Sequence, residues 1–275
     1  MYKKYYNFKE DPFNVTSDPE FFFSSSHHMD AFSHLLYGIQ ERKGILVVTG
    51  EIGTGKTTLC RTLLSRLDQS VKTAFILNPN FSDTQLLQLI VKDLGIEGVY
   101  KNKLALNETL NKFLLEQSTM GNNVVLIIDE AQNLRANQLE QIRLLSNLET
   151  EKNKLLQIIL VGQPELIGKL NLTSLRQLNQ RIFVRYHVLP LKKDEIHKYI
   201  NHRLKVASQS KNGHIPVKFT SEAIDALYLY SKGTPRLINI LCDRALLFGY
   251  ANELTTFNDE VIYKCAREVG QTSSP

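Results

Sequence analysis

A glycine-rich segment that follows a short apolar run constrains this chain more than any other feature of its sequence. The segment reads Gly50-Glu-Ile-Gly-Thr-Gly-Lys-Thr57, matches the pattern G-x-x-x-x-G-K-[ST], and comes directly after the apolar run at 45–49. Glycines at these places let backbone N–H groups converge on a phosphate at the start of a helix. Such a loop needs a strand before it and a helix after it. The pattern therefore predicts a sheet with a phosphate site at its strand ends.

In this interpretation each polar side chain of the loop has a role. The Lys56 ammonium neutralises phosphate oxygens, and the Thr57 hydroxyl binds Mg²⁺. At ordinary residue usage the pattern arises by chance in on the order of 1% of chains this long, so a plain glycine turn is the weaker interpretation. The predicted nucleotide-binding residues are Gly50, Glu51, Ile52, Gly53, Thr54, Gly55, Lys56, Thr57 and Thr58.

Five short β-rich runs predict the strands of an α/β fold. Several of the runs are apolar throughout, which is typical of parallel strands covered by helices on both faces. Helical patterns lie between them, such as Leu59, Leu63 and Leu67 at every fourth position. We therefore expect a five-stranded parallel sheet flanked by helices. The runs span residues 45–49, 73–77, 124–128, 156–161 and 182–188.

Polar side chains follow two more of these strands. The third run is followed by Asp129 and Glu130, and the fourth by Gly162 and Gln163. Open α/β sheets bind ligands beyond the carboxyl ends of their strands. We therefore expect Asp129 to hold Mg²⁺ and Glu130 to orient or deprotonate the attacking water. Gln163 is expected to hold that water as a sensor, although a turn residue that caps the next helix is the alternative.

Three arginines are candidates for contacts with the nucleotide. Arg176 and Arg181 precede the fifth run, and their spacing on a helix turns through about 140°, so both cannot face one phosphate. We expect Arg181 to be an arginine finger that reaches a neighbouring subunit, with Arg176 as the alternative. Arg236 would stand in the first turn of a helix, against the dipole preference, and a bound triphosphate would offset that cost. Exposed arginines in solvent or ion pairs are the competing interpretation for all three.

Beyond Pro190 the strand patterns stop and helical patterns follow, which predicts a small all-α lid. The expected organisation has four parts. Residues 1–43 form an aromatic amino-terminal segment packed on the ATPase core, 44–190 the α/β subdomain, 191–270 the lid, and 271–275 a disordered tail. Binding of adenine by the aromatic segment, with Phe21 to Phe23, is the alternative to capping the core.

Composition places the chain among ordinary globular proteins. Its 33 Lys and Arg against 28 Asp and Glu give a net charge of +5, and no apolar run approaches the about 20 residues that span a bilayer. No secretory signal is visible, so a cytoplasmic protein is expected.

Cys60, Cys242 and Cys265 are too far apart for a metal knuckle and are expected to be core thiols. His27 and His28 lack a partner at metal-ligand spacing, which favours a capping or nucleotide-edge role.

Together these features resemble those of AAA+ ATPases, and more narrowly those of the general secretion pathway protein A (ExeA-like) family. The resemblance covers most of the chain. It rests on the phosphate loop and on residues 6–13 (YNFKEDPF), 17–23 (SDPEFFF), 36–39 (LYGI), 129–132 (DEAQ), 162–166 (GQPEL) and 233–239 (GTPRLIN).

The resemblance implies an ATPase that requires Mg²⁺ and ATP, assembles into a homo-oligomeric ring or filament, and helps to build a type II secretion or pilus apparatus. Longer members continue into a transmembrane helix and a peptidoglycan-binding part, whereas this chain ends at Pro275. Envelope proteins would then recruit it to the inner membrane. An ATP-gated DNA-binding regulator of the transposition type is the alternative, and a signalling switch is a third possibility. Nucleic acid is not favoured as a partner, because the basic residues are scattered and form no stripe.

Overall fold

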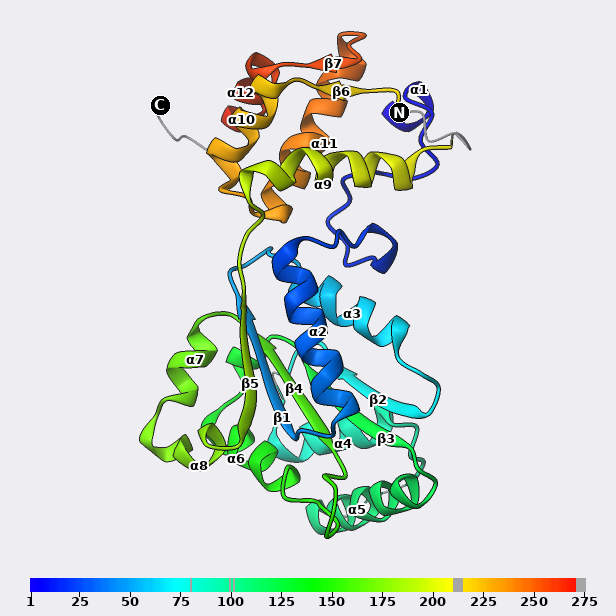
Figure 1. The fold of residues 1–275 in the computed structure, drawn as a ribbon, viewed down its shortest axis with the longest axis vertical. Coiled ribbons are helices and arrows are strands. Elements are labelled where there is room, and N and C mark those ends of the chain that lie inside the picture. Colours follow the sequence, from blue (N-terminus) through cyan, green and yellow to red (C-terminus); the bar gives the residue numbers. More distant parts are fainter. Residues whose placement is uncertain (80, 99, 101, 210–214, 271–275) are drawn as a thin grey trace. The chain divides into compact units, whose positions relative to one another are not determined.

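The computed structural model describes residues 1–79, 81–98, 100, 102–209 and 215–270, and these form two compact parts (Figure 1). The α/β part comprises residues 29–52 and 59–188. The helical part comprises residues 1–28 and 53–58 together with the chain from residue 189 onward. The expected tail at 271–275 lies outside the described residues.

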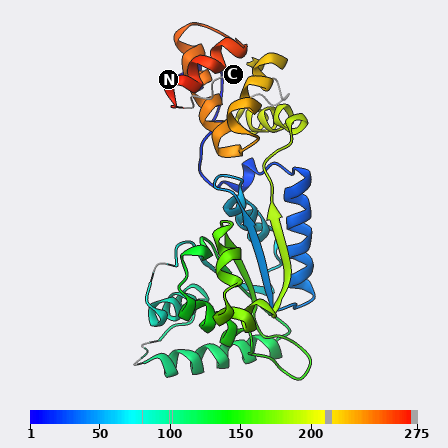
Figure 2. The same cartoon turned by 90° about the vertical axis from the view of Figure 1, so that its left-hand side faces the viewer.

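A five-stranded parallel sheet is the centre of the α/β part, as predicted (Figures 1 and 2). Its strand order is β2-β3-β4-β1-β5. Every residue of the three inner strands is buried, which explains their continuous apolar sequences, whereas β5 alternates between half-buried and exposed residues as an edge strand does. The strands are β1 (Ile45–Gly50), β2 (Val71–Ile76), β3 (Asn123–Ile128), β4 (Gln157–Gly162) and β5 (Ile182–Val188).

Helices cover the sheet and bury one apolar face each. In α4 the Ser82 side chain and Gln85 form a capping box at the start, and Gly95, with φ 73°, follows the end. The helices and short 3₁₀ turns of this region are α2 (Ser26–Gln40), α3 (Lys56–Arg66), α4 (Asp83–Asp93), α5 (Lys103–Thr119), η2 (Ala131–Asn133), α6 (Ala136–Leu145), α7 (Glu165–Leu170), η3 (Thr173–Leu175) and α8 (Arg176–Asn179).

Four helices dominate the C-terminal region, as expected for a lid. They are α9 (Lys193–Ala207), α10 (Ser221–Ser231), α11 (Pro235–Ala251) and α12 (Asp259–Glu268). This region also contains two parallel strands of two residues each, β6 (Lys218–Phe219) and β7 (Thr256–Phe257), which no sequence pattern predicted. Two residues are too short for a periodic pattern to appear, so the lid is helical but not purely so.

The aromatic amino-terminal segment differs from its expected place. Its side chains Tyr6, Phe8, Phe13 and Phe21 were expected on the ATPase core, but they lie in one hydrophobic core with residues of α9–α12. This segment also contains α1 (Tyr2–Tyr5) and η1 (Pro19–Phe21).

A buried arginine explains this packing. The Arg203 guanidinium donates from Nε to the Pro12 carbonyl at 2.6 Å and from Nη2 to the Asn14 carbonyl at 2.9 Å, and it lies 4.6 Å from the centre of the Phe21 ring. Arginine side chains are usually exposed to solvent. Arg203 is instead 5% exposed, because it satisfies carbonyl groups of the amino-terminal segment.

Two further expectations concern cysteines and membrane spans. Cys60, Cys242 and Cys265 are all buried, which confirms that they are core thiols. Within the described ranges, no helix combines the length and the apolar character that crossing a membrane requires.

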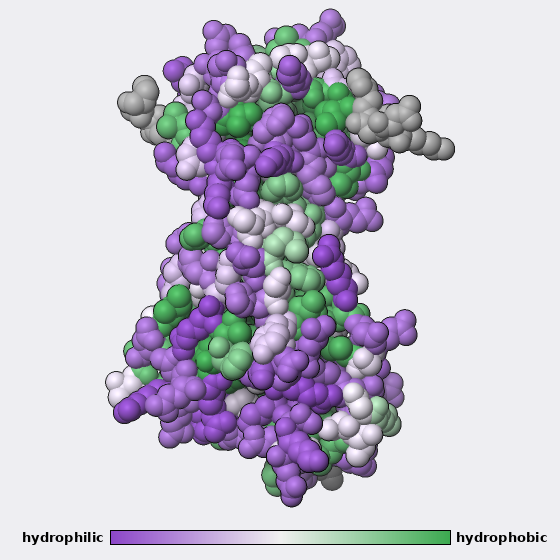
Figure 3. All heavy atoms as spheres, in the orientation of Figure 1, coloured by the Kyte–Doolittle hydropathy of each residue, from purple (hydrophilic) through white to green (hydrophobic). Residues whose placement is uncertain are grey.

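Figure 3 shows hydrophilic residues over most of the viewed face of the α/β part, with exposed apolar residues in small separate groups.

Candidate functional site

The predicted phosphate loop connects β1 to α3, because β1 ends at Gly50 and α3 begins at Lys56. Gly53 and Gly55 have φ values of 80° and 93°, which residues with a side chain rarely adopt. A Cβ on Gly53 would lie 2.6 Å from the Cβ of Arg236, and one on Gly55 would lie 3.0 Å from Nε2 of His28. The loop is therefore a cradle that only glycine can form at these two positions.

His28 holds the loop from the side. Its Nε2 lies 2.8 Å from the Thr54 carbonyl oxygen, and its Nδ1 lies 2.6 Å from the Ser25 hydroxyl. Since a carbonyl only accepts, Nε2 carries the proton, and Nδ1 of the neutral ring accepts from Ser25. Burial lowers the pKa of His28, although the contact with Thr54 opposes that shift. The sequence suggested a capping or nucleotide-edge role for His27 and His28, and the structure assigns His28 a contact with the loop backbone.

Arg236 also lies against the loop. Its backbone N–H donates to the Gly53 carbonyl at 3.2 Å, and its side chain is exposed. Arg236 is in the first turn of α11, which Pro235 begins after the left-handed Gly233. Arg236 therefore lies in the first turn of a helix, as the sequence predicted, and its backbone contacts the phosphate loop.

Two carboxylates follow β3 in the α/β part. Asp129 is 2% exposed, and its Oδ1 accepts the Glu130 N–H at 2.9 Å. Glu130 is half-buried and has the left-handed angles φ 52° and ψ 37°. That conformation costs about 1–2 kcal/mol for a residue with a side chain, and such strain is common at functional sites.

Two glutamine amides hold the Glu130 carboxylate. Nε2 of Gln163 donates to Oε2 of Glu130 at 3.2 Å, and Nε2 of Gln132 donates to the same oxygen. Oε1 of Gln132 in turn accepts the backbone N–H of Gln163 at 3.0 Å. The structure thus brings Gln163 and Gln132 to Glu130, whereas the predicted role of Gln163 in holding a water stays a prediction. Sequence reasoning had included Gln132 in a motif without giving it a role.

These groups share one edge of the sheet. Strands β1, β3 and β4 are parallel neighbours, so their carboxyl ends, followed by the phosphate loop, the two carboxylates and Gln163, point the same way. Carboxylate and hydroxyl oxygens are the ligands that Mg²⁺ prefers, so the residues present suit this ion. The edge therefore presents carboxylate oxygens and amide donors.

The two candidate finger arginines lie elsewhere. Arg176 begins α8, which ends at Asn179, so Arg181 is outside the helix, and the idea that one helix carries both residues is wrong. Arg181 is exposed and directly precedes β5, at the amino edge of the sheet. A hydrogen bond from Lys154, and to a lesser extent the charge of Arg181, hold the pKa of Glu149 below its usual value. Arg181 therefore lies near the loop that precedes β4, at the opposite edge from the carboxyl ends.

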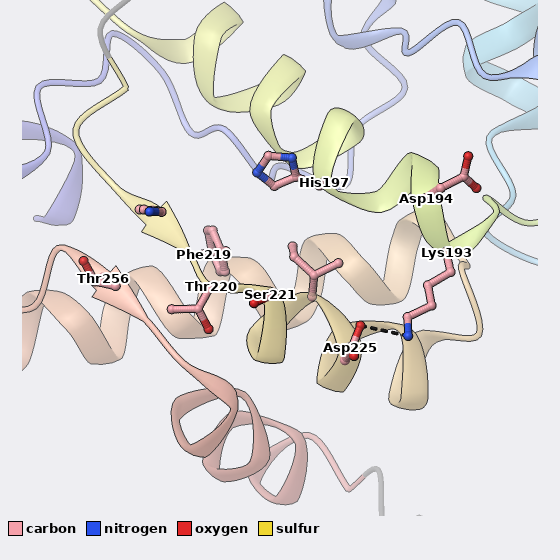
Figure 4. Close-up of a pocket in the computed structure, with 10 residues that line it drawn as sticks. Lys193, Asp194, His197, Phe219, Thr220, Ser221, Asp225 and Thr256 are labelled. Atoms are coloured by element: carbon pink, nitrogen blue, oxygen red, sulfur yellow. Dashed lines mark ion pairs between the residues drawn. The ribbon is translucent and has the colours of Figure 1, made fainter.

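A pocket of about 850 Å³ lies inside the helical part, between α9, α10, β6 and β7 (Figure 4). Its described lining combines buried Phe219 and Ile224 with polar groups, and Lys193 pairs with Asp225 at 2.9 Å. None of these lining residues is a predicted nucleotide ligand, so the pocket is separate from the phosphate loop.

Comparison with known proteins places this site in context. Residues 39–170 match a family model described as AAA domain. The chain is 40% identical over 259 residues to general secretion pathway protein A of Aeromonas hydrophila, a match that covers 91% of this chain and 45% of that protein. The chain thus spans less than half the length of this relative.

Solved structures share the fold at low identity. The ORC2 protein of Aeropyrum pernix, solved in ADPNP and ADP complexes, matches with a TM-score of 0.67 at 17% identity, over 95% of this chain and 72% of that chain. The ORC1 protein of the same organism, solved in complex with DNA, matches with a TM-score of 0.64 at 16% identity, over 95% and 70%. These likenesses concern the fold alone.

Proposed function

We propose that the chain is an AAA+ ATPase related to general secretion pathway protein A, which binds ATP with Mg²⁺ and hydrolyses the γ-phosphoryl bond. The observation that carries the proposal is the loop after β1, whose left-handed glycines form a cradle between strand and helix. Phosphate groups bind such loops through converging N–H groups at a helix start. The nucleotide ligands are Gly50, Glu51, Ile52, Gly53, Thr54, Gly55, Lys56, Thr57, Thr58 and Arg236.

The chain's own groups supply the remaining chemistry. Thr57 and Asp129 are the proposed ligands of Mg²⁺, which when bound neutralises charge on the phosphate oxygens. Glu130 accepts the proton of the attacking water, and Gln163 donates a hydrogen bond that orients it. Arg236 binds the triphosphate from the helical part, and Arg181 completes the site of a neighbouring subunit.

Two substitutions separate binding from hydrolysis. Lys56→Ala removes the phosphate-binding ammonium, and we expect at least a tenfold loss of ATP affinity by fluorescence titration. Glu130→Gln keeps the shape but removes the base, so we expect unchanged affinity and a loss of kcat of about 10²–10⁴ in phosphate release. Lys112→Ala, at an exposed position of α5, is the matched control. Wild-type hydrolysis that survives both substitutions would exclude this site as its source.

The biological role is proposed from the relative. We propose that the protein oligomerises in an ATP-dependent manner in the cytoplasm and drives assembly of a type II secretion or pilus apparatus, recruited to the inner membrane by envelope proteins. Support comes from 40% identity to general secretion pathway protein A. ATP-dependent co-purification of the Glu130→Gln protein with a secretion or pilus component tests the role.

DNA binding is the second candidate, favoured by the fold shared with an ORC1 protein solved in complex with DNA. The test titrates Glu130→Gln protein, saturated with Mg·ATP, with labelled duplex DNA over a salt series. Tight ATP-dependent binding with a steep salt slope would favour a regulator of the transposition type. Absence of binding, under conditions in which the protein oligomerises, would favour envelope assembly.

A further inference from the structure

The Gln132 side chain makes two hydrogen bonds of opposite polarity. Its Nε2 donates to the Glu130 carboxylate, and its Oε1 accepts the Gln163 N–H at 3.0 Å. A carboxylate only accepts and a backbone N–H only donates, so a flipped amide would face two repulsive contacts. The Gln132 amide therefore has a single favourable orientation, and it joins Glu130 to the end of β4.

The surroundings of Gln132 hold it close to β4. A Cβ on Gly162 would lie 2.8 Å from Oε1 of Gln132 and 3.3 Å from its backbone N, so only glycine allows this approach. On the other side, Nζ of Lys169 in α7 donates to the Gln132 carbonyl at 2.5 Å and to the Leu134 carbonyl at 3.0 Å. The amide of Gln132 is thus held by Gln163, which directly follows β4, and its backbone carbonyl by Lys169 of α7.

Glu130 needs such an external support. Its backbone is strained, and a glutamate side chain has three torsions to restrict. A general base works only when its carboxylate lies within hydrogen-bond reach of the proton that it removes. Gln163 holds the same Oε2 atom through its side-chain amide alone, whereas Gln132 also accepts a backbone N–H, that of Gln163 directly after β4.

We propose that Gln132 is a positioning residue for hydrolysis, which fixes the Glu130 carboxylate relative to the end of β4. The inference rests on the proposed ATPase function and names a further residue that this reaction requires. Gln132 acts through Glu130 and has no contact with the nucleotide in this role. Its removal should therefore slow turnover without weakening ATP binding.

The first test compares three variants by steady-state phosphate release and ATP titration. For Gln132→Met, which keeps the side-chain length without hydrogen bonds, and for Gln132→Ala, we expect kcat to fall at least tenfold and KM and ATP affinity to change less than twofold. The control is Gln117→Ala, because Gln117 is 9% exposed, bonds to the Asn122 amide at 2.8 Å and belongs to α5. We expect Gln117→Ala to keep wild-type kcat.

A double-mutant cycle shows whether Gln132 acts through Glu130. In the Glu130→Gln background, single-turnover hydrolysis should change less than twofold when Gln132→Met is added, since the base is already absent. An equal fold-loss in both backgrounds would overturn the proposal, and so would a wild-type or higher kcat in Gln132→Met alone. Failure of the proposed function looks different: hydrolysis would then be insensitive to Lys56→Ala and Glu130→Gln.

Discussion

At the scale of a single residue, the protonation of His28 affects stability, because its buried ring contacts the phosphate loop. Its pKa lies below 6.5 because the ring is buried, so the unfolded chain binds a proton at a higher pH than the folded protein does. The stabilising effect of the neutral ring is therefore complete above pH 6.5 and is lost as the pH falls through the folded pKa. Burial also lowers the pKa of His202, and the charges of Arg203 and Lys205 are smaller causes of that shift.

We predict that the wild-type protein loses stability as the pH falls below about 6.5, before its carboxylates titrate. His28→Gln, which retains an amide donor for the Thr54 carbonyl but does not titrate, should reduce this pH dependence, and the double variant with His202→Gln should reduce it further. Urea denaturation at pH 5.5 and 7.5 measures the difference. An unchanged pH dependence in the double variant would show that other groups cause it.

At the same scale, residues that closely follow a predicted strand could be identified from the sequence alone. Lys56, Asp129 and Glu130 are fixed by short-range spacing after an apolar run, so their positions could be read without a structure. Gln132 and His28 could not, because a glutamine or histidine has no local signature. Their roles depend on Gln163 and Thr54, which are distant in sequence and come near only in the fold.

Among the elements, strands of the sheet were predictable and the short elements were not. The five expected runs agree with β1–β5 to within two residues at each end, because burial on both faces requires continuous apolar sequence. Strands β6 and β7 have two residues each, and α8 is a short helix that ends at Asn179, so none of the three is long enough to show a periodic pattern. The amino-terminal aromatic residues indicated burial, but their partners in α9–α12 lie about two hundred residues away in sequence, beyond the reach of any local pattern.

The start of α11 depends on one glycine. Gly233 has φ 78°, its carbonyl accepts the Leu191 N–H at 2.9 Å, and a Cβ there would overlap the Leu191 carbonyl oxygen. We predict that Gly233→Ala destabilises the helical part by about 3 kcal/mol or more, since it combines backbone strain with a clash against main chain. Gly270→Ala is the matched control, with φ 75° and open space around it, and should cost only about 1 kcal/mol. Equal losses in denaturant titrations of the two variants would show that the clash relaxes.

On the scale of the whole molecule, Arg181 and the carboxyl ends of the strands occupy opposite edges of one sheet. Arg181 precedes β5, whereas Glu130 follows β3, and the strands run parallel. An arginine at the amino edge is therefore far from the Glu130 of its own sheet, although a neighbouring copy could place it there. We therefore propose that Arg181, if it is the arginine finger, acts between subunits and that hydrolysis depends on assembly.

Mixing two inactive variants tests that dependence. Arg181→Ala should lower kcat by about 10³-fold or more, and Glu130→Gln is inactive for lack of its base. In a mixed assembly, an Arg181→Ala subunit keeps Glu130 and receives Arg181 from a Glu130→Gln neighbour, so we expect phosphate release to recover to a substantial fraction of the wild-type rate. The same mixture with Arg176→Ala in place of Arg181→Ala determines which arginine is the finger. The contrary outcome is a rate of phosphate release in both mixtures that does not exceed the sum of the two separate variants, while light scattering shows mixed oligomers. The finger would then not act between subunits, because the mixed oligomers contain sites with every group that the proposal requires.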